Sequence, residues 1–289
     1  MRCYLADCDS PSNTAQQSAE MPVEVAIADI DSYSMLFYGH YLRYNERAAN
    51  RCLAAGSAVL RRVLLAKYAN SVRWNDDVRI RTTAMPAPEG APSDEHSLLH
   101  EWVGLNSKVV YSALCCYTVR GASDGFTGAL RAETKVLRRI TAAQREAAML
   151  FSAQGGRKSE TFAVFPDMLS GTGTLSTPCM MDLFERQRTK LIGGQDELER
   201  LKAAEGTMIV VYSIQQLELP PTPVQPRDEI EAASAFTIEG DGRFFCVKQS
   251  VTHRATGAVC AEGYLKLVFV KDGAVVKAPA ATLSRLGAV

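Results

Sequence analysis

The feature of this sequence that most limits its fold is an internal repeat. An offset of 139 residues carries Glu46-Arg47 onto Glu185-Arg186 without a gap. The same offset carries the apolar pair Tyr41-Leu42 onto Met180-Met181. A single unit made of one helix and one sheet leaves a face and an edge of its sheet that need a partner. Two copies in one chain therefore predict two tandem units that pack as a pseudo-dimer.

Both copies show the same order of elements, because apolar residues recur first with strand spacing, then with helix spacing, and then with strand spacing again. In the first copy we expect a strand at 23–28, a helix at 38–55, and strands at 59–72, 77–85, 97–106 and 108–120. In the second copy we expect a helix at 177–192 and strands at 243–253 and 258–271. An offset of 151 carries Asp77 onto Asp228, so about twelve extra residues should lie within 194–206.

The domain boundaries follow from composition. Residues 1–21 are rich in Ser, Gln, Asn and Ala and predict a disordered tail. We expect the first unit at 22–121, a linker with a helix at 122–160, and the second unit at 161–289. The linker helix, at 128–151, is basic and amphipathic. It could contact a membrane or an acidic carrier protein, but we interpret it as a connection between the units.

Composition excludes several classes of protein. The 289 residues carry 32 basic and 32 acidic side chains, so no polyanion-binding surface and no nucleic-acid partner are expected. No apolar run is long enough to span a bilayer, and the N-terminal residues lack the apolar segment of a secretory signal. A cytoplasmic protein is the expectation. The eight cysteines show no zinc spacing, and the adjacent Cys115 and Cys116 should pack on opposite faces of a strand.

The candidate chemistry lies where the first strand turns into the first helix. Asp29 and Asp31 precede a helix that starts near Tyr38. The first N–H groups of a helix have no partner within it and carry the positive end of its dipole, so they can polarise a carbonyl that a nearby acid attacks. This arrangement predicts an acyl-transfer site.

This stretch resembles the hotdog-fold thioesterases of the 4-hydroxybenzoyl-CoA thioesterase type, whose motif reads Asp-x-Asp-x-x-Gly and later Tyr-x-x-x-x-Glu-x-Ala. The matching positions here are Asp29, Asp31, Tyr38, Tyr41 and Glu46. The family glycine is replaced by Ser34, at a position where glycine usually provides a positive φ. Residues 68–80 also resemble the second strand, loop and third strand of that family.

The resemblance implies an α+β fold of two tandem hotdog units, each a long helix wrapped by an antiparallel sheet. It also implies hydrolysis of an acyl thioester, of coenzyme A or of an acyl-carrier protein, to free acid and thiol. Asp31 would act as nucleophile or general base, and the backbone N–H near Tyr38 would bind the carbonyl oxygen. No metal and no cofactor are expected, since coenzyme A is part of the substrate. The pseudo-dimer could further assemble as a homo-oligomer.

Each candidate has a simpler interpretation. Asp31 could merely cap the turn, as Asp often does, and His40 could be a packed residue rather than a group that orients substrate or water. Glu46 recurs as Glu185, which favours a structural role with Arg47 as a possible ion-pair partner, although in a second branch of the family a helix acid is the catalyst. Asp29 is expected to be structural. His96 and His100 should lie far apart on a strand, so we expect no metal site there.

The second copy loses the acid. At the offset of 139, Asp31 becomes Ser170, Ser34 becomes Gly173 and Tyr38 becomes Thr177. Asp167 could substitute only if the turn shifted its register. We therefore expect one working site, at the first helix. Two alternatives stay open: a non-catalytic acyl-CoA-binding protein, and a hotdog hydratase or dehydratase, although the Asp and His motif typical of that branch is not found.

Overall fold

The computed structural model describes residues 18–31, 33–53, 57–86, 88, 90–120, 157–239 and 242–285. The chain divides into two compact units, Met1–Ala142 (unit 1) and Ala143–Val289 (unit 2). The predicted helix at 128–151 and residues 1–17 of the predicted tail lie outside the described residues. The packing of the units as a pseudo-dimer stays a prediction.

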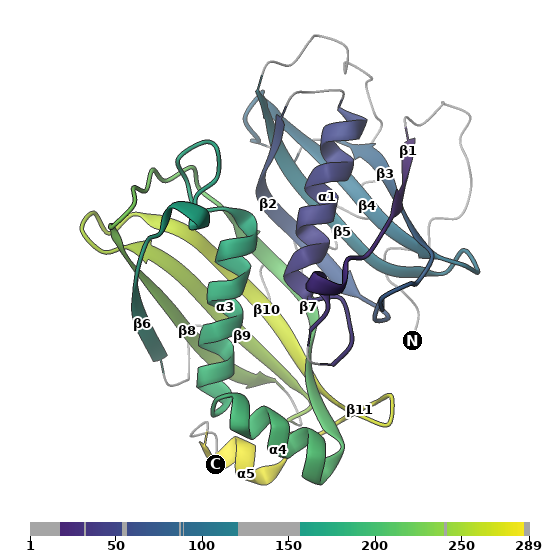
Figure 1. The fold of residues 1–289 in the computed structure, drawn as a ribbon, viewed down its shortest axis with the longest axis vertical. Coiled ribbons are helices and arrows are strands. Elements are labelled where there is room, and N and C mark those ends of the chain that lie inside the picture. Colours follow the sequence, from purple (N-terminus) through teal and green to yellow (C-terminus); the bar gives the residue numbers. More distant parts are fainter. Residues whose placement is uncertain are drawn as a thin grey trace. The chain divides into compact units, whose positions relative to one another are not determined.

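Unit 1 is one helix on one face of an antiparallel sheet (Figure 1). The helix is α1 (Tyr38–Cys52). The strands are β1 (Ser18–Val23), β2 (Ser57–Tyr68), β3 (Val78–Met85), β4 (Glu95–Gly104) and β5 (Val109–Arg120), in the spatial order β1-β3-β4-β5-β2. The buried positions of α1 recur at helical spacing, and Leu42, Asn45 and Ala49 among them are fully buried. This face of α1 packs against the sheet.

Unit 2 repeats this plan with additions (Figure 1). Its helices are α3 (Thr177–Ile192), α4 (Gln195–Glu205) and α5 (Ala280–Arg285). Its strands are β6 (Arg157–Ala163), β7 (Thr207–Glu218), β8 (Glu229–Glu239), β9 (Phe244–His253), β10 (Val259–Lys271) and β11 (Ala274–Val276). Their order is β7-β10-β9-β8-β6, and β11 pairs with β10. The predicted α+β fold of two tandem units, each a helix on an antiparallel sheet, is confirmed.

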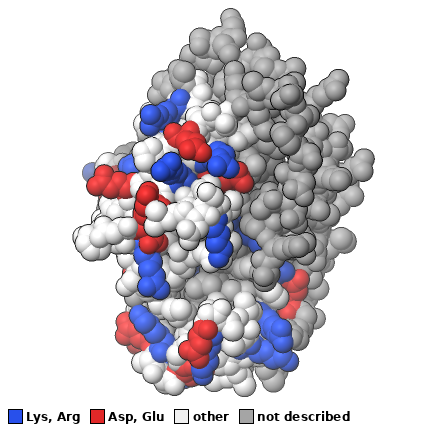
Figure 2. All heavy atoms as spheres, turned by 90° about the vertical axis from the view of Figure 1, so that its right-hand side faces the viewer, with Lys and Arg blue, Asp and Glu red and all other residues white. Residues whose placement is uncertain are grey.

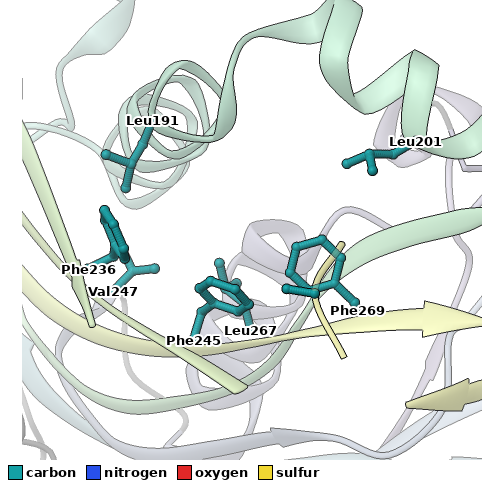
Figure 3. Close-up of a cluster of buried hydrophobic side chains, with 8 residues drawn as sticks. Leu191, Leu201, Phe236, Phe245, Val247, Leu267 and Phe269 are labelled. Carbon is teal, nitrogen blue, oxygen red and sulfur yellow. The ribbon is translucent and has the colours of Figure 1, made fainter. Parts of the chain in front are cut away.

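The core of unit 2 beneath α3 is apolar. In Figure 3, Leu191 of α3 and Leu201 of α4 face aromatic and aliphatic side chains of the sheet. The sheet side chains of this cluster are Phe236, Phe245, Val247, Leu267 and Phe269. A cavity of about 10 Å³ remains there, which is room for one water molecule. The cluster therefore serves as packed core and offers no ready space for a ligand.

The turn before each helix confirms the repeat in detail. Each turn contains a short 3₁₀ helix, η1 (Ile27–Asp29) in unit 1 and η3 (Pro166–Met168) in unit 2, and each is closed by one isolated bridge, Ile30 with Leu36 and Leu169 with Leu175. Ser34 has φ +60° and its counterpart Gly173 has φ +72°. The turn thus keeps the glycine conformation although unit 1 has a serine there.

The second offset is one residue larger than we predicted. The Asp76 carboxylate accepts the Arg73 N–H at 2.7 Å, and the Asp228 carboxylate accepts the Gln225 N–H at 2.7 Å. Asp228 is therefore the counterpart of Asp76, not of Asp77. A one-residue slip in a strand would exchange its two faces. This register places the alternating buried residues Val78, Ile80, Thr82 and Ala84 of β3 onto the buried Ile230, Ala232, Ser234 and Phe236 of β8. The extra residues form α4.

Three other boundaries were wrong. Of the strand expected at 23–28 only Val23 is a strand residue, because β1 ends there and the chain turns into η1. Val23 and Val25 are both buried, which gives this stretch the alternating pattern of a strand. β1 begins at Ser18, inside the predicted tail 1–21, because its residues pair with β3. β6 begins at Arg157, inside the predicted linker 122–160, because it pairs with β8.

The described surface carries both signs of charge. On the face that Figure 2 shows, basic and acidic side chains of the described residues are interspersed. Within the described ranges, no helix has both the length and the apolar character needed to cross a membrane. Cys115 and Cys116 are both free and fully buried in β5, in line with a packing role.

Candidate active site at the start of helix α1

Asp29 is the buried centre of a polar cluster. Its side chain is 4% exposed, and three side chains from the first two turns of α1 converge on it. The Tyr44 hydroxyl donates to Oδ2 at 2.6 Å, Arg43 donates to Oδ1, and Nδ1 of His40 lies 3.3 Å from Oδ1. Burial alone would raise the pKa of the Asp29 carboxyl, but the hydrogen bonds from Tyr44 and Arg43 outweigh it and lower that pKa. Asp29 is thus held as an anion.

The backbone joins this cluster to the helix start. The Phe37 N–H donates to the Asp29 carbonyl at 2.9 Å, so η1 and the residue before α1 are locked together. The His40 ring lies edge-on to the Phe37 ring, with 5.2 Å between centroids. His40 is therefore held by an aromatic ring on one side and by the Asp29 carboxylate on another.

Asp31 occupies the tight turn rather than the Asp29 cluster. Its Oδ1 accepts the Tyr33 N–H at 2.8 Å and the Met35 N–H at 3.1 Å. In unit 2 the hydroxyl of Ser170 takes the corresponding place and accepts the Thr172 N–H at 3.2 Å. The turn-capping role that we had set against catalysis is therefore present in the structure. These bonds also hold the Asp31 carboxylate in one orientation.

The two helix starts differ in a way that matters for an oxyanion. The residue before α1, Phe37, contributes no side-chain cap. The residue before α3, Ser176, caps the Cys179 N–H with its hydroxyl at 3.4 Å. The second helical residue is Gly39 in α1 and Pro178 in α3, so the latter has no N–H to offer. The His40 N–H, which corresponds to that of Cys179, donates to the Phe37 carbonyl at 2.9 Å, so the difference in donors between the two helix starts is the Gly39 N–H, which α3 lacks.

Tyr38, the first residue of α1, is fixed from below. Its carbonyl accepts the Tyr68 hydroxyl at 3.0 Å, and the residue as a whole is 8% exposed. Next to it lies a layer of aromatic rings in mutual contact, made by the buried Tyr41, Trp102 and Tyr111 and the half-buried Tyr68. A helix start supported in this way is preorganised, which is the condition for a useful oxyanion site.

Glu46 lies two turns further along α1 and serves the sheet. Its carboxylate accepts the Leu60 N–H of β2 at 3.2 Å. Its counterpart Glu185 accepts the Thr189 hydroxyl at 3.3 Å and pairs with Arg188, not with Arg186. Arg47 stacks over the Tyr44 ring, 5.2 Å from its centroid. The structure therefore supports a packing role for Glu46 and does not bring it to the Asp29 cluster.

Two features of unit 1 were missed in the sequence. One is the contact of Asp29 with His40, Arg43 and Tyr44. These residues follow Asp29 by 11, 14 and 15 positions, and their shared face at the start of the predicted helix was a usable signal. The other is fully buried His100, whose Nδ1 lies 3.0 Å from the Thr82 hydroxyl and whose Nε2 lies 2.9 Å from the Tyr117 hydroxyl. Burial lowers the pKa of His100 to about 3, so it is neutral.

Unit 2 has none of the Asp29 cluster. At the offset of 139 its members Asp29, His40, Arg43 and Tyr44 become Met168, Cys179, Asp182 and Leu183. No group of three His, Cys, Asp or Glu side chains suited to a metal occurs among the residues that the structure describes. The polar arrangement at the helix start thus belongs to unit 1.

Several solved structures are similar to this chain over a length that includes both units. The chain is similar to RV0216, a conserved hypothetical protein from Mycobacterium tuberculosis that has a double hotdog fold, with 11% identity and a TM-score of 0.57 over 89% of this chain and 97% of that chain. The chain has a double hotdog fold. No protein-family model and no curated protein sequence matches it.

Two further double-length matches carry names of enzymes. This double hotdog chain is similar to the 12:0-ACP thioesterase from Umbellularia californica, with 6% identity and a TM-score of 0.58 over 88% of this chain and 95% of that chain. It is also similar to the dehydratase domain of the polyketide PpsC from Mycobacterium tuberculosis, with 12% identity and a TM-score of 0.50 over 88% and 93%. At such identities the likeness establishes the fold, and the chemistry has to be argued from the site.

Proposed function

We propose that this double hotdog protein hydrolyses an acyl thioester, of coenzyme A or of an acyl-carrier protein, to free acid and thiol. The observation that carries the proposal is the difference between the two helix starts. Unit 1 combines two acids, a histidine and a helix start without a side-chain cap. Unit 2 has a capped helix start with a proline and no such cluster. The site therefore belongs to α1 of unit 1.

The chemistry needs few groups. A thioester carbonyl is electrophilic enough that a positioned carboxylate and backbone donors can act on it without a metal. The thioester oxygen would lie at the first N–H groups of α1, near Tyr38 and Gly39. Asp31, which two amides of its own turn orient, would attack the carbonyl carbon as nucleophile. The setting would be the cytoplasm, where acyl-CoA and acyl-carrier protein occur, and no separate cofactor is required.

A thiol-release screen across acyl chain lengths tests the proposal. The purified protein is mixed with acyl-CoA esters of increasing length, including aromatic acyl groups, and free thiol is followed with a disulfide reagent. We expect one class of ester to be hydrolysed with a kcat that Asp31→Asn reduces by at least about a hundredfold. Retention of intact acyl-CoA without thiol release would instead indicate the non-catalytic acyl-CoA-binding alternative.

A hotdog hydratase or dehydratase is the second candidate, and a specific contact favours it. That branch typically pairs Asp with His, and the structure brings Asp29 and His40 to 3.3 Å although no such motif was found in the sequence. One structural neighbour is named a dehydratase domain. Hydration of an enoyl-CoA is measured as the loss of its ultraviolet absorbance. Such a loss without release of thiol would support this candidate.

A further inference from the structure

The two ring nitrogens of His40 lie in different surroundings. Its Nδ1 is buried and faces the Asp29 carboxylate at 3.3 Å, slightly longer than a good hydrogen bond, whereas the side chain as a whole keeps 17% of its surface exposed. A proton on Nδ1 would face the carboxylate, and the lone pair of Nε2 would then lie on the opposite edge of the ring.

Asp29 is itself held in place by hydrogen bonds to its side chain and its backbone. The Tyr44 hydroxyl and the Arg43 guanidinium bind its two oxygens, and its backbone carbonyl accepts the Phe37 N–H. A carboxylate fixed behind a histidine selects the tautomer and orientation of the ring. The contacts of the His40 side chain are thus the Asp29 carboxylate and the Phe37 ring, and Arg43 binds the same carboxylate oxygen that lies near Nδ1.

Resting on the proposed thioester hydrolysis, we propose that Asp29 is a positioning residue for His40, and that Nε2 of His40 activates the water that hydrolyses the acyl group after Asp31 has accepted it. Asp29 does not touch the substrate in this scheme. In unit 2 the equivalents of Asp29 and His40 are Met168 and Cys179, which could not position a histidine or activate a water in this way.

The protons balance over one cycle. In the first step Asp31 forms a bond to the thioester carbonyl carbon, the C–S bond breaks, and the departing sulfur takes a proton from the imidazolium of His40. In the second step Nε2 of the now neutral His40 takes a proton from water, whose oxygen forms a bond to the acyl carbon. The bond between that carbon and Asp31 breaks, which restores the carboxylate, and the imidazolium is ready for the next cycle. The sum is thioester plus water to acid plus thiol.

Thiol release in stopped flow tests the scheme, with an S-acyl nitrothiophenol as the probe, because its thiolate absorbs visible light and leaves without help. We expect His40→Asn to release about one equivalent of thiol in a burst and then to turn over at least about a hundredfold more slowly than the unchanged protein. The acyl group should then be found on Asp31 by mass spectrometry. Asp31→Asn should show no burst. Cys179→Ser, at the equivalent place in unit 2, is the matched control and should behave like the unchanged protein.

The role of Asp29 is tested in combination with His40. Asp29→Asn should reduce the rate of turnover after the burst by roughly tenfold. The variant that carries both Asp29→Asn and His40→Asn should turn over no more slowly than His40→Asn alone, since Asp29 acts only through the His40 ring. A purely structural Asp29 would instead multiply the two losses. If Asp29→Asn does not fold, Tyr44→Phe takes its place in the comparison with His40→Asn. It removes one hydrogen bond to the Asp29 carboxylate, so a smaller loss of turnover is expected.

The outcomes separate the two proposals. Absence of thiol release from every thioester by the unchanged protein would refute the proposed function. Hydrolysis that His40→Asn leaves at the unchanged rate, or that it slows without a burst or an acyl adduct, would overturn the role of the pair and leave the function in place. Multiplicative losses in the double variant would overturn the role of Asp29 alone.

Discussion

The buried histidine of unit 1 should make its stability depend on pH. His100 is fully buried and neutral, and burial lowers its pKa to about 3 from an ordinary value of 6.5. The unfolded chain therefore binds a proton below about pH 6.5, whereas the folded protein does not until about pH 3. The contribution of His100 to stability is present above pH 6.5 and is lost progressively as the pH falls towards 3. Between pH 7 and pH 5 the loss amounts to about 2 kcal/mol.

The matched variant is His100→Gln, because unit 2 already has Gln249 at the corresponding place, where it donates to the Ser234 hydroxyl at 2.8 Å. Glutamine can therefore bond Thr82 and cannot titrate. Both tryptophans, Trp74 and Trp102, lie in unit 1, so urea unfolding followed by tryptophan fluorescence reports on this unit. The difference in unfolding free energy between the two proteins should change by about 2 kcal/mol from pH 7 to pH 5. An unchanged difference would refute the neutral buried histidine.

Three further predictions concern the turn and the helix start. Asp31→Asn should reduce kcat at least about a hundredfold with little change in unfolding temperature, whereas Asp167→Asn should leave kcat unchanged; equal losses would contradict a single site in unit 1. Gly39→Pro copies the second residue of α3, so it should fold but lose an N–H donor and about 10²–10³-fold in kcat, while the reverse change Pro178→Gly should not alter it. Ser34→Gly should raise the unfolding free energy by about 1 kcal/mol, because glycine adopts the φ of +60° without strain; a lower value in urea titration would show that the serine side chain stabilises the turn.

The helices and strands were largely predictable, and the reason is periodic burial. The expected helix at 177–192 has the observed bounds, and the two strands expected at 243–253 and 258–271 begin and end within one residue of β9 and β10. No strand had been predicted at β6, β7 or β8. The failures are local. Val23 and Val25 are both buried, which looked like a continuing strand, yet only pairing with β3 decides where the strand ends. The offset across the insertion needed the hydrogen bonds of Asp76 and Asp228, because composition alone does not specify a register.

The site was predictable as a place but not as a set of partners. The motif pointed to the turn and the start of α1, and the structure has a polar cluster there. It could not show that Asp29, which we expected to be structural, is the acid that contacts His40, because that contact depends on how η1 directs the carboxylate towards α1. The role of Asp29 is more than structural only if the pair acts in catalysis, which the double variant decides.

The comparison of the two units shows what the fold itself requires at the turn before each helix. Both units keep the same turn, with matching 3₁₀ helices, bridges and a positive φ at Ser34 and Gly173. Fold requirements alone therefore do not need the buried Asp29 anion, since unit 2 forms the same turn with Met168 in its place. In unit 1 the hydrogen bonds from Tyr44 and Arg43 outweigh the burial of Asp29 and keep it an anion. The fold can thus omit this cluster in one copy, while the other copy holds a buried carboxylate charged beside His40, which is the arrangement that the proposed chemistry at α1 would use.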